Sequence, residues 1–240
     1  MSRIAVVTGG TRGLGRAIAI TLKMDGFRVV SVYRGQHEAA EMFHEETSIP
    51  IYAWDVCSFQ DCVDGLKRVE SEVGPVDVLV NNAGITRDSV FHRMSEQQWF
   101  DVMRTNLGSL FNMSRNVIEG MRERGYGRIV NISSINGQKG QVGQVNYAAS
   151  KAGVLGFTKA LALESARKGV TVNAVAPGYC ETEMLVAIQP ELLKAIVAGI
   201  PAGRLGRPQD VARMVSLLVS EEAGFITGAT FDINGGQLMN

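Results

Sequence analysis

The 240-residue chain has 24 basic and 24 acidic residues, and 45% of its residues are hydrophobic. This balance excludes the basic surface of a nucleic-acid-binding protein, and no segment reaches the ~18 apolar residues of a membrane span. The three cysteines, Cys57, Cys62 and Cys180, match no close-paired zinc pattern and are typical of reduced thiols. The first apolar run is too short for a signal peptide. We therefore expect a cytoplasmic protein with no nucleic-acid or membrane partner.

Short runs rich in Val and Ile alternate with segments of helical length along the whole chain. They lie at residues 3–10, 27–34, 51–56, 76–84, 127–134, 170–178 and 230–236. Several are continuously apolar, which is typical of strands that helices cover on both faces. The sequence thus predicts one domain, residues 1–240, built on a doubly wound, Rossmann-type α/β sheet of about seven parallel strands. Residues 179–207 lack a clear strand and follow a strand end, so we expect a substrate lid there.

A glycine cluster follows the first predicted strand and opens a helix. Gly9, Gly13 and Gly15 form G-x-x-x-G-x-G, which differs from the G-x-G-x-x-G spacing of the common dinucleotide fingerprint. Glycines here let the backbone approach a pyrophosphate, whose charge a helix N-terminus stabilises. A purely structural tight turn is the alternative. The position after the first strand favours a dinucleotide site.

The second predicted strand ends in Tyr33-Arg34-Gly35 and not in the acidic residue that would bind the ribose 2′-hydroxyl of NAD. A guanidinium suits a 2′-phosphate, and Arg12 in the glycine turn is a second possible phosphate partner. Both arginines could instead be solvated surface residues. We predict NADPH/NADP as the cofactor.

Tyr147 and Lys151 stand four residues apart in the small-residue segment "NYAASKAG". On a helix this spacing places both side chains on one face. A phenol releases its proton reluctantly, and an adjacent cation favours the ionised form. The pair is therefore a candidate proton donor with its tuning cation, or else two long side chains that meet solvent.

Further motifs fall in order at predicted strand ends. "NNAG" covers residues 81–84, Ser134 ends "NISS" thirteen residues before Tyr147, and "APG" covers residues 176–178. Together with the glycine turn and Tyr147-x-x-x-Lys151, they resemble the short-chain dehydrogenase/reductase family over essentially the whole chain. The resemblance implies an NADP-dependent oxidoreductase whose catalytic residues are Asn106, Ser134, Tyr147 and Lys151.

In that family, a nicotinamide supplies hydride to a carbonyl and the tyrosine supplies the proton. The resemblance further implies that Lys151 binds the nicotinamide ribose, Ser134 the substrate carbonyl, and that Asn106 feeds protons to Lys151 through a water. It adds to the cofactor site Asp55, Asn81, Gly84, Tyr147, Lys151, Pro177, Gly178 and Thr182. Asp55, Asn81 and Thr182 could instead be capping or turn residues.

Two groups within the family come closest. "SSINGQKGQVGQVNY" and "GFITGATFDINGG" resemble acetoacetyl-CoA reductases of polyhydroxyalkanoate synthesis, and "AGITRD" is shared with 3-oxoacyl-carrier-protein reductases of fatty acid synthesis. Both reduce a 3-oxoacyl thioester to the 3-hydroxyacyl product. The first resemblance implies an acyl-CoA substrate, acetoacetyl-CoA, bound by Ser134, Gln141, Gln144, Tyr147 and Tyr179.

The second resemblance implies an alternative substrate, the 3-oxoacyl group carried by an acyl carrier protein. The two docking arginines that carrier-protein reductases place near the cleft correspond here to Gly125 and Lys168, with Arg124 adjacent. A nucleotide-sensing regulator on the same fold is a third, non-catalytic alternative. The intact Asn106, Ser134, Tyr147 and Lys151 argue against it.

Two further expectations concern metals and assembly. His37, Glu41 and His44 fall at helical spacing but lie in a polar segment, so we predict a solvated helix face and no metal. The amphipathic helix "RNVIEGMRERG" is expected to be partly buried or at a subunit contact. The family is usually tetrameric, and the apolar C-terminal strand fits that assembly. We expect a homotetramer.

Overall fold

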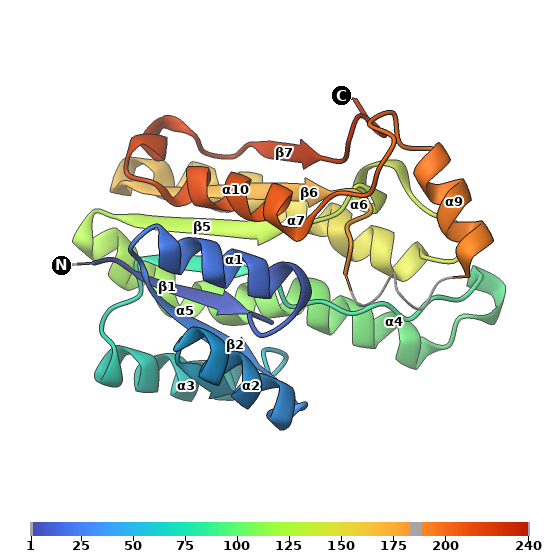
Figure 1. Cartoon of the computed structure of the whole chain (residues 1–240). Coiled ribbons are helices and arrows are strands. Elements are labelled where there is room, and N and C mark those ends of the chain that lie inside the picture. The colour runs from blue at the N-terminus through green and yellow to red at the C-terminus, as the bar shows by residue number, and fades with distance from the viewer. Residues whose placement is uncertain (1, 183–188, 240) are drawn as a thin grey trace.

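The computed structural model describes residues 2–182 and 189–239. Its described strands form one seven-stranded sheet in the order β3-β2-β1-β4-β5-β6-β7, and every neighbouring pair is parallel (Figure 1). The strands are β1 (Ile4–Thr8), β2 (Arg28–Tyr33), β3 (Ile51–Ala53), β4 (Val78–Asn81), β5 (Gly127–Ile132), β6 (Val170–Pro177) and β7 (Thr230–Ile233). The predicted Rossmann-type sheet is confirmed, with each strand inside its predicted segment.

Helices cover both faces of the sheet. Three pack on one face, α1 (Gly13–Met24), α2 (His37–Thr47) and α10 (Pro208–Val219), and three on the other, α3 (Phe59–Glu72), α5 (Ser109–Arg124) and α7 (Val145–Ser165). Shorter helices are α4 (Glu96–Met103), α6 (Asn136–Lys139) and α9 (Pro190–Ala198), with 3-10 turns at Phe91–Arg93, Ala166–Lys168 and Glu222–Phe225 and a π-helix at Arg104–Gly108. In Figure 1, α4 and α9 lie beyond the arrowheads of the strands.

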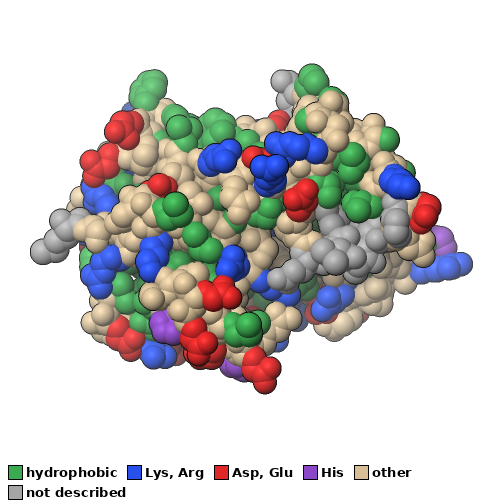
Figure 2. Space-filling model, in the orientation of Figure 1, with side chains coloured by type: hydrophobic (Ala, Val, Ile, Leu, Met, Phe, Trp, Pro, Cys, Tyr) green, Lys and Arg blue, Asp and Glu red, His purple; other side chains and the backbone are tan. Residues whose placement is uncertain are grey.

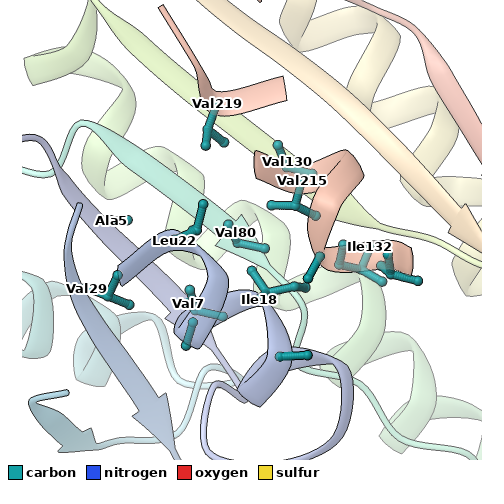
Figure 3. Packing of buried hydrophobic residues seen from close by; sticks show 14 of the residues in the cluster. Ala5, Val7, Ile18, Leu22, Val29, Val80, Val130, Ile132, Val215 and Val219 are labelled. Atoms are coloured by element: carbon teal, nitrogen blue, oxygen red, sulfur yellow. The ribbon is translucent and has the colours of Figure 1, made fainter. Parts of the chain in front are cut away.

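The core explains why the strands are so continuously apolar. All five residues of β1 are buried, because α1 and α10 cover one face and α5 the other. Figure 3 shows Ile18 and Leu22 of α1 meeting Val215 and Val219 of α10 above the strands, and all four side chains are fully buried. The spacing of four residues places each pair on one helix face.

The connection order places a crevice at the carboxyl ends of the strands. The chain runs from β1 outward to β2 and β3, then returns to add β4 on the other side of β1. The loops that leave β1 and β4 therefore diverge, which opens the crevice where open α/β sheets bind ligands.

The surface carries mixed charge. Figure 2 shows Lys and Arg side chains interspersed with Asp and Glu over the visible face. No helix among the described residues is long and apolar enough to cross a membrane.

Candidate active site

A cleft of about 1190 Å³ runs along the carboxyl ends of the strands. Its walls come from the loops after β1, β2, β3, β4, β5 and β6 and from the first turns of α7. The cleft brings together most of the residues that the sequence predicts for a site: Gly9, Arg12, Gly13, Gly15, Arg34, Asp55, Gly84, Ser134, Gln144, Tyr147, Lys151, Pro177, Gly178, Tyr179 and Thr182.

Three predicted site residues do not line this cleft: Asn81, Asn106 and Gln141. Asn81 is 3% exposed, and its side-chain amide donates to Ser114 and Asn131 in the interior. The next residue, Asn82, lines the cleft in its place, and its Nδ2 donates to the carbonyls of Thr8 and Gly9. Successive strand residues face opposite sides, so one position decides which asparagine reaches the site.

The turn after β1 requires its glycines. A Cβ on Gly15 would lie 2.1 Å from the Gly9 carbonyl oxygen, and Gly9 has a φ of +62°. The turn leads into the N-terminus of α1, whose first N–H groups have no partner within the helix. Backbone N–H groups and the positive end of the helix dipole therefore face the cleft, as a phosphate site needs.

Arg34 and Asp55 meet at the far end of the cleft. Arg34 Nη1 lies 3.0 Å from Asp55 Oδ2, and the arginine side chain is 70% exposed. Asp55 also accepts from the backbone N–H of Cys57 at 2.9 Å. The carboxylate is thus fixed by the loop after β3, and it holds the exposed guanidinium at the cleft.

Gly137 lets α6 pack closely against α7 at Lys151. A Cβ on Gly137 of α6 would lie 2.7 Å from the backbone carbon of Lys151. Lys151 is buried, and its Nζ donates to the carbonyl of Ile132 at the end of β5 at 2.8 Å. Burial lowers the pKa of Lys151 from 10.5 to about 8. The ammonium therefore loses its proton more easily than an ordinary lysine.

Tyr147 is partly buried beside this lysine. Lys151 Nζ lies 5.7 Å from the centre of the Tyr147 ring. Burial raises the pKa of the Tyr147 phenol, a hydrogen bond with Ser134 opposes that rise, and the charge of Asp88 adds to it. The net direction is a rise, opposite to the lowering that the sequence led us to expect from Lys151. A raised pKa keeps the phenol protonated and able to act as an acid.

Asn106 lies in the π-helix Arg104–Gly108 and is fully buried. Its side chain accepts from the backbone N–H of Ile85 at 2.8 Å and donates to the Ile85 carbonyl at 3.0 Å and to Ser150 at 3.2 Å. A Cβ on Gly84 would lie 3.3 Å from Asn106 Oδ1 and 3.5 Å from Lys151 Nζ. Asn106 and Lys151 therefore flank one small space beside Gly84, which the sequence motif alone does not reveal.

The amino ends of the strands, on the side of the sheet away from the cleft, hold Gly125, Lys168 and Arg124. Gly125 stands two residues before β5 and Lys168 two residues before β6. A Cβ on Gly169 would lie 2.2 Å from the Gly125 carbonyl oxygen. Arg124 donates to the Val76 carbonyl at 2.6 Å and lies 3.8 Å from Asp77. The expectation that these positions lie near the cleft of their own chain is wrong, because they precede parallel strands and the cleft follows them.

The histidines of α2 have local partners. His37 hydrogen-bonds Tyr33 at 3.1 Å, and His44 hydrogen-bonds the Ile49 carbonyl at 2.8 Å. Within residues 2–182 and 189–239, no group of three or more His, Cys, Asp or Glu side chains is arranged to hold a metal ion.

Comparison with known proteins connects this geometry to a family. The short chain dehydrogenase family matches residues 3–192. The chain is 59% identical to an acetoacetyl-CoA reductase of Rhizobium meliloti (strain 1021) and 56% identical to one of Paracoccus denitrificans, over 99% of both chains in each case. It is 45% identical to a 3-oxoacyl-[acyl-carrier-protein] reductase of Vibrio cholerae, over 99% of this chain and 98% of the relative. The chain belongs to the short-chain dehydrogenase family and is an oxidoreductase of the kind that uses a nicotinamide dinucleotide.

Proposed function

We propose that this enzyme reduces the 3-oxo group of acetoacetyl-CoA with NADPH and forms the 3-hydroxyacyl-CoA. The observation that carries the proposal is the meeting of Ser134, Tyr147 and Lys151 in one cleft with the glycine turn after β1. The relatives named acetoacetyl-CoA reductase, which match end to end, favour this thioester.

The residues of the cleft fit a phosphorylated dinucleotide. Gly9 and Gly15 let the turn after β1 pack tightly on itself and on the loop after β4, and the N-terminus of α1 stabilises a pyrophosphate. Arg34 and Arg12 line the same cleft and would bind a 2′-phosphate, with Asp55 fixing Arg34. When bound, the nicotinamide supplies the hydride that the protein itself cannot provide. Gly84, Pro177, Gly178 and Thr182 would contact the rest of the cofactor.

The chain's own residues manage the proton and the developing negative charge. Tyr147 would donate its proton to the carbonyl oxygen, and the Ser134 hydroxyl would donate a hydrogen bond to the same oxygen. Lys151, with its lowered pKa, would return a proton to the Tyr147 phenolate and hold the ribose. Asn106 would help replace that proton through the small space beside Gly84.

The substrate end of the cleft would be formed by Gln144 and Tyr179, with Gln141 close by in sequence. We propose residues 179–207 as the lid; residues 183–188 of this segment lie outside the described residues. The base of the segment is fixed, because Gly206 donates to the Tyr179 carbonyl at 2.9 Å and Glu181 donates to the Gly206 carbonyl at 2.8 Å. Any closure of the lid would therefore occur beyond this bridge.

A homotetramer remains a prediction, as does a cytoplasmic location. Support for assembly comes from the stacked rings of Phe59 and Phe111, whose centres lie 5.9 Å apart although both residues are about half exposed. Such an aromatic pair suits a subunit contact.

The alternative is the carrier-protein form of the same substrate, which the 45% identical relative supports. Spectrophotometric assays of NADPH oxidation with acetoacetyl-CoA and with the acetoacetyl carrier protein, at equal ionic strength, decide between them. We expect a lower KM for acetoacetyl-CoA. A kcat/KM about tenfold or more in favour of the carrier protein would overturn the preference, because that ratio corresponds to about 1.4 kcal/mol of transition-state binding.

A further inference from the structure

Asn136 joins the catalytic serine to the substrate end of the cleft. It is 7% exposed, begins α6 and lines the cleft. Its backbone N–H donates to Ser134 Oγ at 3.1 Å, and its Nδ2 donates to Gln144 Oε1 at 2.9 Å. Gln144 Nε2 in turn donates to Asp88 Oδ2 at 2.8 Å. Four residues thus form one chain of hydrogen bonds along the cleft wall, which links the loop after β4 to Ser134.

Asp88 fixes the orientation of the two side-chain amides in this chain, those of Gln144 and Asn136. A carboxylate accepts hydrogen bonds and does not donate them, so the Nε2 of Gln144 must face Asp88. The Oε1 of Gln144 then faces Asn136, and Asn136 must offer its Nδ2. Asn136 Oδ1 is consequently left over, and it is buried with no hydrogen-bond partner among the described residues. An orphan acceptor is unfavourable, so the amide would turn if the chain did not hold it.

The same residue orients the hydroxyl of Ser134. Because Ser134 Oγ accepts from the backbone of Asn136, its proton is free for another acceptor, and Ser134 hydrogen-bonds Tyr147. The position of Asn136 therefore bears on both groups that would touch the thioester, Ser134 directly and Gln144 through the side-chain amide.

We propose that Asn136 is a positioning residue that holds Gln144 in one orientation, with Asp88 setting the polarity of the hydrogen-bond chain. The proposal deepens the proposed function, since it assigns how the substrate end of the cleft is held in shape. It predicts that the hydrogen-bond polarity of the chain, and not merely the presence of an amide, controls thioester binding.

The sharpest test reverses the polarity. Asn136→Asp removes the donor that faces Gln144 and places a carboxylate on both sides of the Gln144 amide. Asp88→Asn removes the charge that fixes the polarity, although its Oδ1 can still accept from Gln144. The double variant Asp88→Asn/Asn136→Asp restores both hydrogen bonds after a flip of the Gln144 amide and has the net charge of the parent. We expect Asn136→Asp to raise the KM for acetoacetyl-CoA about tenfold, the effect of a hydrogen bond of ~1.4 kcal/mol, and Asp88→Asn to raise it by less. We expect the double variant to recover to within about threefold of the parent, half a decade or less.

The affinity for NADPH should stay near the parent's in all three variants, which separates positioning of the thioester from general damage to the cleft. Lys139→Ala, on the exposed side of the same short helix, is the matched control and should leave KM unchanged. A double variant no better than the product of its single variants would overturn the proposal. So would an Asn136→Asp enzyme with the KM of the parent.

A second measurement needs no substrate. Side-chain amide protons of Gln144, assigned by their loss in Gln144→Ala, should exchange slowly in the parent enzyme and quickly in Asn136→Ala. Fast exchange in the parent would overturn the positioning role even if acetoacetyl-CoA is reduced. Slow exchange in a parent that does not reduce acetoacetyl-CoA would instead refute the proposed substrate and leave the hydrogen-bond chain intact.

Discussion

The two ends of β5 each hold a buried cation, and the two cations are satisfied very differently. At the amino end, Arg128 is 4% exposed and donates to the carbonyls of four residues, Gly127, Gly169, Ser220 and Glu221. At the carboxyl end, Lys151 is also 4% exposed, but the described residues give its Nζ one acceptor, the Ile132 carbonyl. Burial lowers the pKa of both side chains.

The number of hydrogen bonds that each cation makes distinguishes a cation that stabilises the fold, Arg128, from one that takes part in the reaction, Lys151. The planar guanidinium of Arg128 uses its fixed fork to tie together the segments before β6 and after α10, and it lies 4.4 Å from the centre of the Tyr126 ring. The ammonium of Lys151 lines the cleft and, among the described residues, uses one donor, to the Ile132 carbonyl. A buried charge whose donors are not all used is unfavourable for stability and available for chemistry.

The largest effect should follow from removing the proton donor beside Lys151. Tyr147→Phe keeps the ring and its packing but loses the hydroxyl. General acid catalysis contributes about 10²- to 10⁴-fold, so turnover should fall by that range while NADPH still binds. Steady-state kinetics and cofactor titration measure the two quantities. Turnover within a few-fold of the parent would remove Tyr147 from the role of acid.

Lys151→Met should damage activity and spare stability. Turnover should fall by about 10²-fold or more, because the phenolate loses its proton source, and NADPH binding should weaken with the ribose contact. The free energy of unfolding at neutral pH should equal or exceed that of the parent, since methionine fills similar space without a buried charge. Denaturant unfolding of the two proteins measures this. A variant much less stable than the parent would contradict the distinction between the two cations.

The same variant has a pH signature. The folded pKa of Lys151, about 8, lies below its ordinary value of 10.5. Between these values the unfolded chain binds more protons than the folded chain, so the free energy of unfolding should rise with pH across this window. That component should disappear in Lys151→Met. Parallel stability curves for the parent and the variant would show that Lys151 does not titrate as inferred.

Arg128→Met should show the reverse pattern. It leaves buried carbonyls without donors, which lowers the free energy of unfolding by ~2–4 kcal/mol. The folded fraction should keep a kcat close to the parent's, because Arg128 lies at the amino end of β5 and the cleft lies at the carboxyl ends of the strands. Arg128→Lys keeps the charge but loses the planar fork of donors. Its free energy of unfolding should lie between that of the parent and that of Arg128→Met. A specific loss of kcat with normal stability would contradict the structural assignment.

The sequence predicted this architecture well where local pattern decides. Continuous apolar runs located all seven strands, and the spacing of Tyr147 and Lys151 predicted their common face. The sequence also indicated where Gly125 and Lys168 lie. Each stands two residues before a predicted strand, which places both at the amino ends of the strands, away from the cleft.

Other features depend on three-dimensional neighbours that no local pattern reveals. Whether Asn81 or Asn82 faces the cleft follows from the register of β4, and the ion pair of Arg34 with Asp55 follows from the pairing of β2 with β3. The chain from Asp88 through Gln144 to Asn136 joins loops far apart in sequence.

A third cation, Arg34, tests the comparison at an exposed site and should give the smallest effect. It already has a carboxylate partner in Asp55, and its side chain is 70% exposed, so solvent and salt screen its charge. Arg34→Asp would replace a phosphate partner by a group suited to a ribose hydroxyl and place two carboxylates together. A charge-assisted hydrogen bond contributes about 1.5–3 kcal/mol, so the NADPH-to-NADH ratio of kcat/KM should fall by roughly one to two decades.

Two further variants serve as controls for Arg34→Asp. In Arg34→Gln the NADPH-to-NADH ratio should fall by less than in Arg34→Asp. Arg16→Gln breaks an exposed ion pair with Glu46 outside the cleft and should leave the ratio unchanged. A parent enzyme that uses both cofactors equally would refute the role of Arg34. If the ratio does fall, raising the salt concentration should shrink the effect, whereas the loss caused by Lys151→Met should persist, because a buried charge is screened far less than an exposed one.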